Sequence, residues 1–346
     1  MSKISRFRAE HVYDQFVEVA APRLSWQVVA DTGNWIQQAY QLRIERGGVW
    51  VEAEKVASPD QVLLAWPFAP LASREIVNVS VRVWGPDGES EWSEPLLIEA
   101  GLLERSDWKT GLVQPPRLGD DKVSYLRAEF AAPKVAKARL YITAQGVYKA
   151  RINGVEVSED RMSPGWTSYS HRLRYQIYDV TALVKSGSNA AAVQLADGWY
   201  AGRLGWWKGG LRHNYGEKLG LIFQLELTDE AGNVAYVTSD AQWKAGMGGI
   251  LETSIYDGET FDANQEPEGW DAAGFDDSSW SAVEIAPLPD VRLVGPQSAR
   301  IKVVQDLEVA RYLTSPSGKK IADLGQVITG HLRLTLKGAP GSTVTL

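Results

Sequence analysis

The chain has 346 residues, a formal net charge of -7 and no cysteine. The lack of cysteine excludes disulfides, thiolate metal centres and a cysteine nucleophile, and the scattered Lys and Arg argue against nucleic acid as a partner. No stretch has the length and apolar composition of a bilayer span, and no apolar run of signal-peptide length follows the basic start. We therefore expect no membrane partner and a cytoplasmic location, and the length predicts roughly two or three domains.

Residues 1–103 have the pattern of a small β-sandwich. Alternation of apolar and polar residues predicts strands at 39–45 and 78–84. The Trp-Ser-Glu-Pro motif at 92–95 resembles the closing segment of a fibronectin type III domain, so we expect a sandwich of that type. Four tryptophans of this region are expected to pack the sandwich rather than to bind a ligand: Trp26, Trp66, Trp84 and Trp92.

Residues 104–290 are predicted to form a jelly-roll domain. Strands are predicted at 124–130, 137–143, 147–152, 190–195, 219–227 and 234–238. The pair Asn153-Gly154 predicts a tight hairpin turn, because both residues tolerate positive φ. Many short strands joined by long loops are typical of a jelly roll.

Residues 291–346 are predicted to begin a further β-sandwich. Residues 331–346 alternate apolar and polar side chains, which predicts a hairpin whose apolar face needs a sheet to pack on. We therefore expect the native chain to continue past Leu346. The fold class predicted for the whole chain is all-β, as tandem β-sandwiches.

Several motifs of the predicted jelly roll, in this order and spacing, resemble the N-terminal jelly-roll domain of bacterial α-L-rhamnosidases. They are Arg-Ile-Asn-Gly-Val-Glu-Val-Ser at 151–158, Ser-Pro-Gly-Trp-Thr-Ser-Tyr at 163–169, Tyr-Asp-Val-Thr at 178–181 and Asp-Gly-Trp-Tyr-Ala-Gly at 197–202. Tyr-Asp-Gly-Glu-Thr-Phe-Asp-Ala at 256–263 resembles the end of the same domain, and Asp-Leu-Gly-Gln at 323–326 resembles the start of the next sandwich in that family.

The resemblance implies an inverting glycoside hydrolase that removes terminal α-L-rhamnose from plant glycosides or polysaccharides. Inversion needs an acid and a base roughly 6.5–9.5 Å apart. In the family these carboxylates lie on a downstream (α/α)6 barrel, which no part of this sequence resembles. We assign no catalytic residue here, expect the catalytic pair downstream of Leu346, and expect the downstream catalytic domain and rhamnose-containing glycans as partners.

The loop at 197–207 is the predicted carbohydrate site, because aromatic faces and a few fixed polar groups are what sugars bind. Its candidate residues are Asp197, Trp199, Tyr200, Arg203, Trp206 and Trp207. Some rhamnosidases carry a related jelly roll that binds rhamnose with calcium, and the resemblance would then place Asp197 near the metal and the sugar. The alternative is that the loop serves packing.

A second set of carboxylates could hold calcium, which prefers hard oxygen ligands. Asp257, Glu259 and Asp262 lie close together in sequence, and Asp197 completes the candidate set. The alternatives are a hydrogen-bonded turn, or a part of the catalytic cleft wall contributed by Asp257 and Glu259. No other cofactor is required by the reaction that the resemblance implies.

Other functions stay open at this point. A carbohydrate-binding module without hydrolysis, a structural spacer, and part of a β-D-glycosidase of related architecture are the alternatives. Trp fluorescence on addition of L-rhamnose, and hydrolysis of an aryl α-L-rhamnoside, distinguish these functions.

Overall fold

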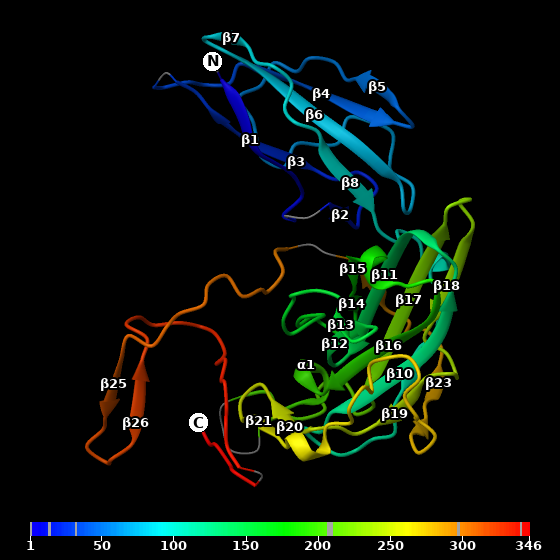
Figure 1. Cartoon of the computed structure of the whole chain (residues 1–346). Helices are drawn as coiled ribbons and strands as arrows, with labels where there is room; N and C mark the ends of the chain where they lie inside the picture. Colours follow the sequence, from blue (N-terminus) through cyan, green and yellow to red (C-terminus); the bar gives the residue numbers. More distant parts are fainter. Residues whose placement is uncertain (1, 13–14, 32, 206–209, 296–297, 340) are drawn as a thin grey trace. The chain divides into compact units, whose positions relative to one another are not determined.

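The computed structural model describes residues 2–12, 15–31, 33–205, 210–295, 298–339 and 341–346, and almost every element in them is a β-strand (Figure 1). This confirms the predicted all-β class. The chain divides into two compact units, Met1–Arg300 and Ile301–Leu346. Within the described ranges, no helix has the length and apolar character needed to cross a membrane.

The first sandwich is built from the strands that precede residue 101. They are β1 (Lys3–Ala9), β2 (Phe16–Val17), β3 (Leu24–Val29), β4 (Ala39–Arg46), β5 (Val49–Glu52), β6 (Ile76–Gly85), β7 (Gly88–Glu89) and β8 (Leu96–Ala100). One sheet has the order β2-β8-β6-β4-β5, with β7 also paired to β6, and the other is the pair β1-β3. The strands predicted at 39–45 and 78–84 are confirmed as β4 and β6.

Alternation along β4 and β6 decides which side chains enter the core of this sandwich. Leu42 and Val81 are paired across the two strands and are buried, whereas their neighbours Arg43 and Arg82 point to the outer face. Trp26 on β3 is buried in the same core, as predicted. The outer face of β4, β5 and β6 is therefore a polar and aromatic surface.

The jelly-roll domain follows as two larger sheets. Its strands are β9 (Leu112–Gln114), β10 (Ser124–Ala132), β11 (Val135–Gln145), β12 (Val147–Ile152), β13 (Val155–Glu156), β14 (Arg172–Arg174), β15 (Gln176–Asp179), β16 (Gly187–Ala196), β17 (Gly220–Asp229), β18 (Val234–Thr238), β19 (Lys244–Gly246), β20 (Ile250–Ser254), β21 (Gly258–Phe261), β22 (Ser281–Ala282), β23 (Glu284–Ala286) and β24 (Arg292–Val294). Its short helices are η1 (Arg105–Asp107), η2 (Thr181–Leu183), α1 (Gly198–Ala201) and η3 (Ala263–Gln265). All strands predicted in this domain form.

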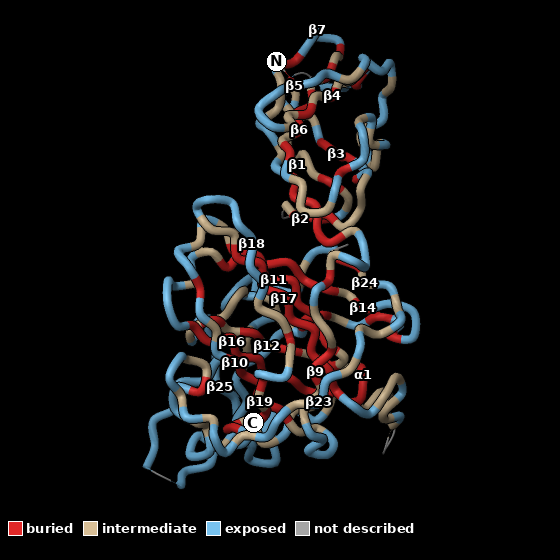
Figure 2. The backbone as a smooth tube through the Cα atoms, turned by 90° about the vertical axis from the view of Figure 1, so that its right-hand side faces the viewer, coloured by how far each residue is buried: buried red, intermediate tan, exposed pale blue. Residues whose placement is uncertain are grey.

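The two sheets have the orders β13-β12-β16-β10-β19-β22 and β15-β11-β17-β9-β23, with β18 on β17. Figure 2 shows buried residues gathered along β10, β11, β16 and β17, which supply most of the core. The predicted hairpin turn joins β12 to β13, and Asn153 and Gly154 have φ of 52° and 81° there. β24 pairs in parallel with β14, so the first compact unit continues beyond residue 290 to Arg300.

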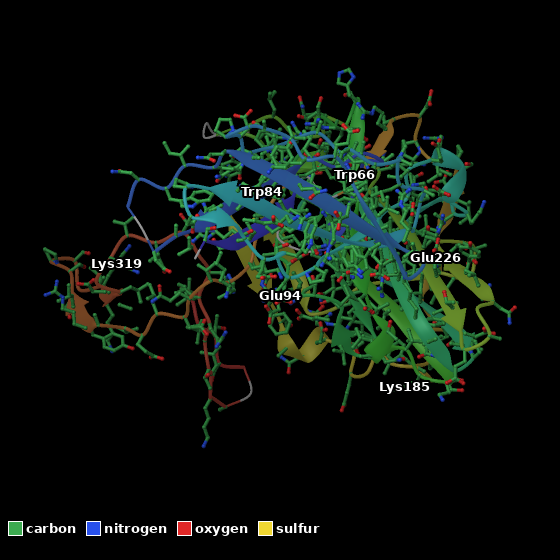
Figure 3. The ribbon with its side chains drawn as sticks, turned by 90° about the horizontal axis from the view of Figure 1, so that it is seen from above. Trp66, Trp84, Glu94, Lys185, Glu226 and Lys319 are labelled. Atoms are coloured by element: carbon green, nitrogen blue, oxygen red, sulfur yellow. The ribbon has the colours of Figure 1, made fainter. Side chains whose placement is uncertain are left out.

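Charged side chains join the first sandwich to the jelly-roll domain. Glu99 on β8 is 1% exposed and accepts two hydrogen bonds of 3.0 Å from the guanidinium of Arg139 on β11. Arg74 donates to both carboxylate oxygens of Glu226 on β17, at 2.6 and 2.8 Å (Figure 3 labels Glu226). Buried charges need partners, and each of these pairs supplies one across the two sandwiches.

The second unit contains one hairpin among its described residues, in which β25 (Arg311–Thr314) pairs with β26 (Lys320–Asp323). The turn between them carries Lys319 (Figure 3). The predicted hairpin at 331–346 is wrong, because the described residues of this segment form no strand. Its apolar side chains, such as Leu334 and Leu336, are exposed, and a hairpin with no sheet beneath its apolar face is marginally stable.

Candidate functional site

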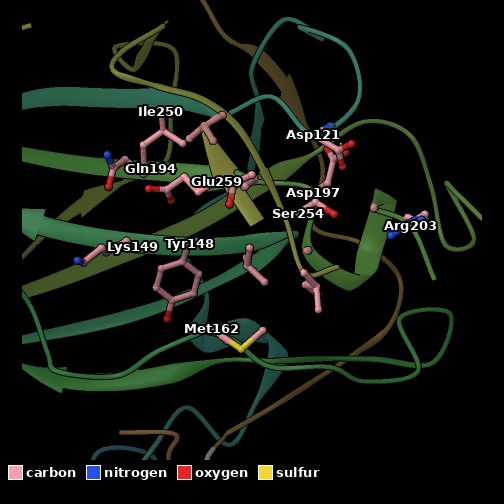
Figure 4. A pocket seen from close by; sticks show the side chains of 17 residues that line it. Asp121, Tyr148, Lys149, Met162, Gln194, Asp197, Arg203, Ile250, Ser254 and Glu259 are labelled. Atoms are coloured by element: carbon pink, nitrogen blue, oxygen red, sulfur yellow. Dashed lines mark hydrogen bonds between the residues drawn. The ribbon is translucent and has the colours of Figure 1, made fainter. Parts of the chain in front are cut away.

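A pocket of about 300 Å³ lies in the jelly-roll domain beside α1 (Figure 4). β12 and β16 form its floor, and the hairpin of β20 and β21 forms another side. Figure 4 shows Asp121 and Asp197 next to each other on one side, with Gln194 and Ile250 on the other. This volume is at the lower end of the range of ligand pockets, roughly 300–1,000 Å³, so the pocket suits one small ligand.

Asp197 supplies the most distinctive polar group of the pocket. It follows β16 directly and begins α1, where its backbone carbonyl accepts hydrogen bonds from Tyr200 N and Ala201 N, each 3.2 Å. The side chain is 2% exposed, and Oδ2 accepts a hydrogen bond of 2.9 Å from the backbone N–H of Asp121. Oδ1 is buried and has no hydrogen-bond partner among the described residues.

Burial raises the pKa of Asp197 above its ordinary value, since the low-dielectric surroundings penalise the charged carboxylate. The single backbone hydrogen bond from Asp121 acts in the opposite direction and does not cancel this effect. A buried oxygen without a partner is costly in a folded protein. A ligand hydroxyl that donates to Oδ1 would remove that cost.

The two glycines of the Asp-Gly-Trp-Tyr-Ala-Gly motif are required by close packing around Asp197. Gly198 has φ of 51°, and a Cβ there would lie 2.4 Å from Cγ1 of Val147. A Cβ on Gly202 would lie 2.3 Å from the carbonyl oxygen of Gly198. The chain therefore turns sharply at the end of β16, and this turn places Asp197 in the pocket wall.

Arg203 lines the same pocket from the residues after α1. Its Nη2 donates to Oδ1 of Asp257 at 2.8 Å, and its guanidinium carbon lies 5.2 Å from the ring centroid of Tyr256. The Nε of Arg203 is buried without a hydrogen-bond partner among the described residues. The pocket thus offers an acceptor at Asp197 and a donor at Arg203.

Two other predicted sugar contacts, Trp199 and Tyr200, do not line this pocket. Trp199 stacks on Trp166 with ring centroids 6.3 Å apart and planes 1° from parallel, and Trp166 is 53% exposed. Tyr200 is buried in the core against Tyr169, at 5.3 Å between ring centroids. The predicted candidates Trp206 and Trp207 lie outside the described residues.

Of the four predicted calcium ligands, Asp197 and Glu259 line the same pocket, whereas Asp257 and Asp262 have other partners. Asp257 is paired with Arg203, Glu259 lines the pocket, and Asp262 accepts a hydrogen bond from Asn264 N at the start of η3. Hydrogen bonds from Gln265 and Asn264 hold the pKa of Asp262 below its ordinary value. No group of three or more His, Asp or Glu in the part of the chain that the structure describes is arranged to hold a metal ion.

Calcium takes six to eight oxygen ligands, and Asp197 supplies one unpartnered oxygen. The four carboxylates therefore do not fit a calcium site in this arrangement. A role for calcium stays a prediction.

Asp121 is a pocket residue that the sequence did not reveal. It has φ of 60°, its carboxylate accepts hydrogen bonds of 2.9 and 2.7 Å from the guanidinium of Arg212, and its carbonyl accepts from Thr253 N at 2.7 Å. The Gly-Asp-Asp run at 119–121 indicates a turn and nothing more. The contact with Asp197 spans 76 residues of sequence and depends on the tertiary fold.

Two family models match the chain. Residues 133–305 match the alpha-L-rhamnosidase N-terminal domain, and residues 4–104 match the Rha78A-like N-terminal immunoglobulin domain. An alpha-L-rhamnosidase of Formosa agariphila is 35% identical over 94% of this chain, and one of Streptomyces avermitilis is 42% identical over 64% of it. The chain spans 37% and 22% of the lengths of these two relatives.

Solved structures agree with these matches. The crystal structure of the alpha-L-rhamnosidase of Aspergillus terreus has a TM-score of 0.87 and 37% identity, covering 94% of this chain and 39% of that one. The Streptomyces avermitilis alpha-L-rhamnosidase complexed with L-rhamnose has a TM-score of 0.84 and 25% identity, covering 94% of this chain and 49% of that one.

Proposed function

The chain belongs to the alpha-L-rhamnosidase N-terminal domain family, as its motifs predict, and from this premise we propose that it is the carbohydrate-handling N-terminal part of an α-L-rhamnosidase. In this proposal the pocket beside Asp197 binds one L-rhamnosyl unit of the substrate. The complete enzyme would hydrolyse terminal α-L-rhamnose with inversion, using an acid and a base from a separate catalytic domain.

The observation that carries the proposal is the buried, unpartnered Oδ1 of Asp197. A sugar hydroxyl can donate to this oxygen, and hydrogen bonds to charged groups contribute about 1.5–3 kcal/mol. L-rhamnose is a 6-deoxy sugar, so it presents a methyl group beside its hydroxyls. Val147, Ile250 and Ile255 give the pocket apolar walls for that methyl group.

The joint between the two domains supports a second part of the proposal, which is mechanical. Glu99 on β8 with Arg139 on β11, and Arg74 in the turn before β6 with Glu226 on β17, connect the two sandwiches through hydrogen bonds of 2.6 to 3.0 Å. Such a joint suits a support that holds the pocket in place beside a catalytic domain, because a flexible linker would let the pocket drift relative to the active site.

The test is a calorimetric titration of L-rhamnose into the chain and into the variant Asp197→Asn. We expect the wild type to bind, and the variant to bind about tenfold more weakly because an uncharged amide replaces the carboxylate acceptor. Asp290→Asn is the matched control, because it removes the same charge from an exposed loop. Equal affinities for the two variants would contradict the proposal.

Two additions to this titration address calcium and catalysis. Repeating it with EDTA decides the role of calcium: retained binding means that the sugar contacts Asp197 directly, and lost binding means that a cation lies between them. We also expect no hydrolysis of an aryl α-L-rhamnoside by this chain. Turnover by the chain alone would refute the proposed division between carbohydrate handling and catalysis.

A further inference from the structure

The outer face of the first sandwich carries a continuous row in which tryptophan rings alternate with cations. The order is Trp50, Arg43, Trp92, Arg82, Trp84 and Lys55, and we call these six residues the ladder. Each cation lies 3.7 to 5.2 Å from the ring centroids that it contacts. Such contacts stabilise by about 0.5–1 kcal/mol each at exposed sites.

Strand register builds most of this row. Arg43 and Arg82 point outward from β4 and β6, and Trp84 follows on the same face of β6 (Figure 3 labels Trp84). Trp50 on β5 is a diagonal neighbour of Arg43, because β5 pairs Glu52 with Arg43. Aromatic and long side chains reach one another across such a diagonal.

Two serines hold Trp92 in the row. Ser90 N donates to Val83 O at 2.9 Å, and the Ser90 hydroxyl accepts from Val83 N at 3.0 Å. Ser93 does the same with Val81, at 2.8 and 3.1 Å. The segment between β7 and β8 therefore pairs with β6 through its serines, and Trp92 is fixed over the outer face. This is the structural basis of the Trp-Ser-Glu-Pro motif.

The cations of the ladder differ in how far their charge is neutralised. Arg82 donates to Gln41 Oε1 at 2.6 Å and forms ion pairs with Glu89 at 2.5 Å and Glu52 at 3.6 Å. Arg43 forms neither a hydrogen bond from its guanidinium nor an ion pair with any residue that the structure describes. Lys55 likewise contacts the Trp84 ring and no described carboxylate.

Arg43 is therefore a guanidinium held between two rings, with its hydrogen-bond donors unused. The nearby carboxylates are already engaged, since Glu45 accepts a hydrogen bond from Asn78 at 2.7 Å and Glu52 accepts one from Gln41 at 3.2 Å. A planar guanidinium binds a carboxylate through two parallel hydrogen bonds. Trp50, which is 38% exposed, offers a ring on which a sugar can pack beside that carboxylate.

We propose that the ladder is a binding surface for carboxylated saccharides, such as a chain of uronic acids. The carboxylate of one sugar pairs with Arg43, a second carboxylate lies near Lys55, and sugar rings pack on the tryptophans between them. Arg43 and Lys55, which form no ion pair among the described residues, provide the local charge complementarity for this ligand. The surface is separate from the pocket of Asp197 and does not depend on its function.

The test compares the binding of two oligosaccharides of equal length, an oligogalacturonate and a neutral maltooligosaccharide, by calorimetry at low salt. We expect binding of the oligogalacturonate alone, weakening as salt screens the charges. Arg43→Gln is expected to reduce affinity about fivefold and Lys55→Gln about twofold, because each removes one of the two unpaired charges. Lys185→Gln is the matched control, since it removes one exposed charge from the jelly-roll domain.

Thermal unfolding separates binding from stability, because Arg43→Gln also removes two ring contacts from the ladder. Lys55 is at the end of the row and exposed, so its variant is expected to fold as the wild type does. Unchanged affinity in Asp197→Asn, together with weaker binding in both ladder variants, supports the proposal. Equal binding of the two oligosaccharides, no binding, or ladder variants that behave like Lys185→Gln would overturn it.

Discussion

The two surfaces with binding chemistry are constructed in opposite ways. Four residues of the ladder, Arg43, Trp50, Arg82 and Trp84, stand on β4, β5 and β6, where pairing register places them on one face. Trp92 and Lys55 lie on segments outside these strands. The pocket is lined by segments that are far apart in sequence. Asp197 Oδ2 accepts a hydrogen bond from Asp121 N, and Arg203 donates one to Asp257. On paired strands, the alternation of side chains between the two faces of the sheet determines which residues form a site. On loops, a site depends on a few long-range contacts and on glycines that permit tight turns.

The largest effect is expected where the two regions are joined. Glu99→Gln leaves Arg139 and Lys137 without their shared buried carboxylate, so the free energy of unfolding should fall by about 3–5 kcal/mol. Urea unfolding measures this change. Glu10→Gln is the control, because Glu10 forms an ion pair with the half-exposed Arg23 in the first sandwich and its loss should cost about 0–1 kcal/mol. Similar losses in the two variants would mean that the joint does not couple the domains.

The next effect tests the loop-built region. Gly198→Ala places a Cβ against Val147 and should lower the free energy of unfolding by about 2–4 kcal/mol, through overpacking and the left-handed backbone. Gly232 also has a positive φ, of 85°, but a Cβ there would have no atom within 4 Å. Gly232→Ala therefore measures the loss of stability caused by the left-handed backbone alone. If both variants lose the same stability in thermal unfolding, the close contact at Gly198 is not what shapes the pocket.

A smaller effect with a defined pH dependence is expected at Asp197. Its folded pKa is raised by burial, so the folded state holds the proton more tightly than the unfolded state does. The charged carboxylate therefore destabilises the fold above the folded pKa and has no such effect below the unfolded pKa. Asp197→Asn should be more stable than the wild type at neutral pH, and the difference should vanish near pH ~4 and below, where the carboxyl group is protonated in both states. Thermal unfolding across this range measures it, and a difference that does not change with pH would be inconsistent with this explanation.

The smallest effect concerns the strand-built region. Ser93→Ala removes the acceptor of the Val81 N–H and should cost about 0.5–1.5 kcal/mol. The tryptophan emission should also shift as Trp92 moves away from Arg43 and Arg82. Ser93→Thr keeps the hydroxyl and is the control. Unchanged emission in Ser93→Ala would show that the serine does not position the ladder.

The same contrast explains which features could be predicted from the sequence. The pattern at 124–130 predicts most of β10, and Asn153-Gly154 predicts its hairpin turn, because both depend on local alternation and turn chemistry. The sequence predicts a packing role for Trp84 and Trp92, and the structure places both rings in contact with cations of the ladder. Asp197 and Arg203 were found through their motif.

Other features could not be predicted because they depend on tertiary contacts. Nothing local indicates that Asp121 contacts Asp197, or that Trp199 turns toward Trp166 rather than toward the pocket. The alternation at 331–346 indicates a strand, but alternation gives a strand only where a neighbouring strand pairs with it, and none does so among the described residues.

The most direct test of the central claim is a crystal structure of the chain grown with L-rhamnose. We expect one sugar in the pocket beside α1, with a hydroxyl within hydrogen-bond distance of Asp197 Oδ1 and the methyl group toward Val147 or Ile250. An empty pocket at saturating sugar, or a sugar bound only beside Trp166 and Trp199, would contradict it.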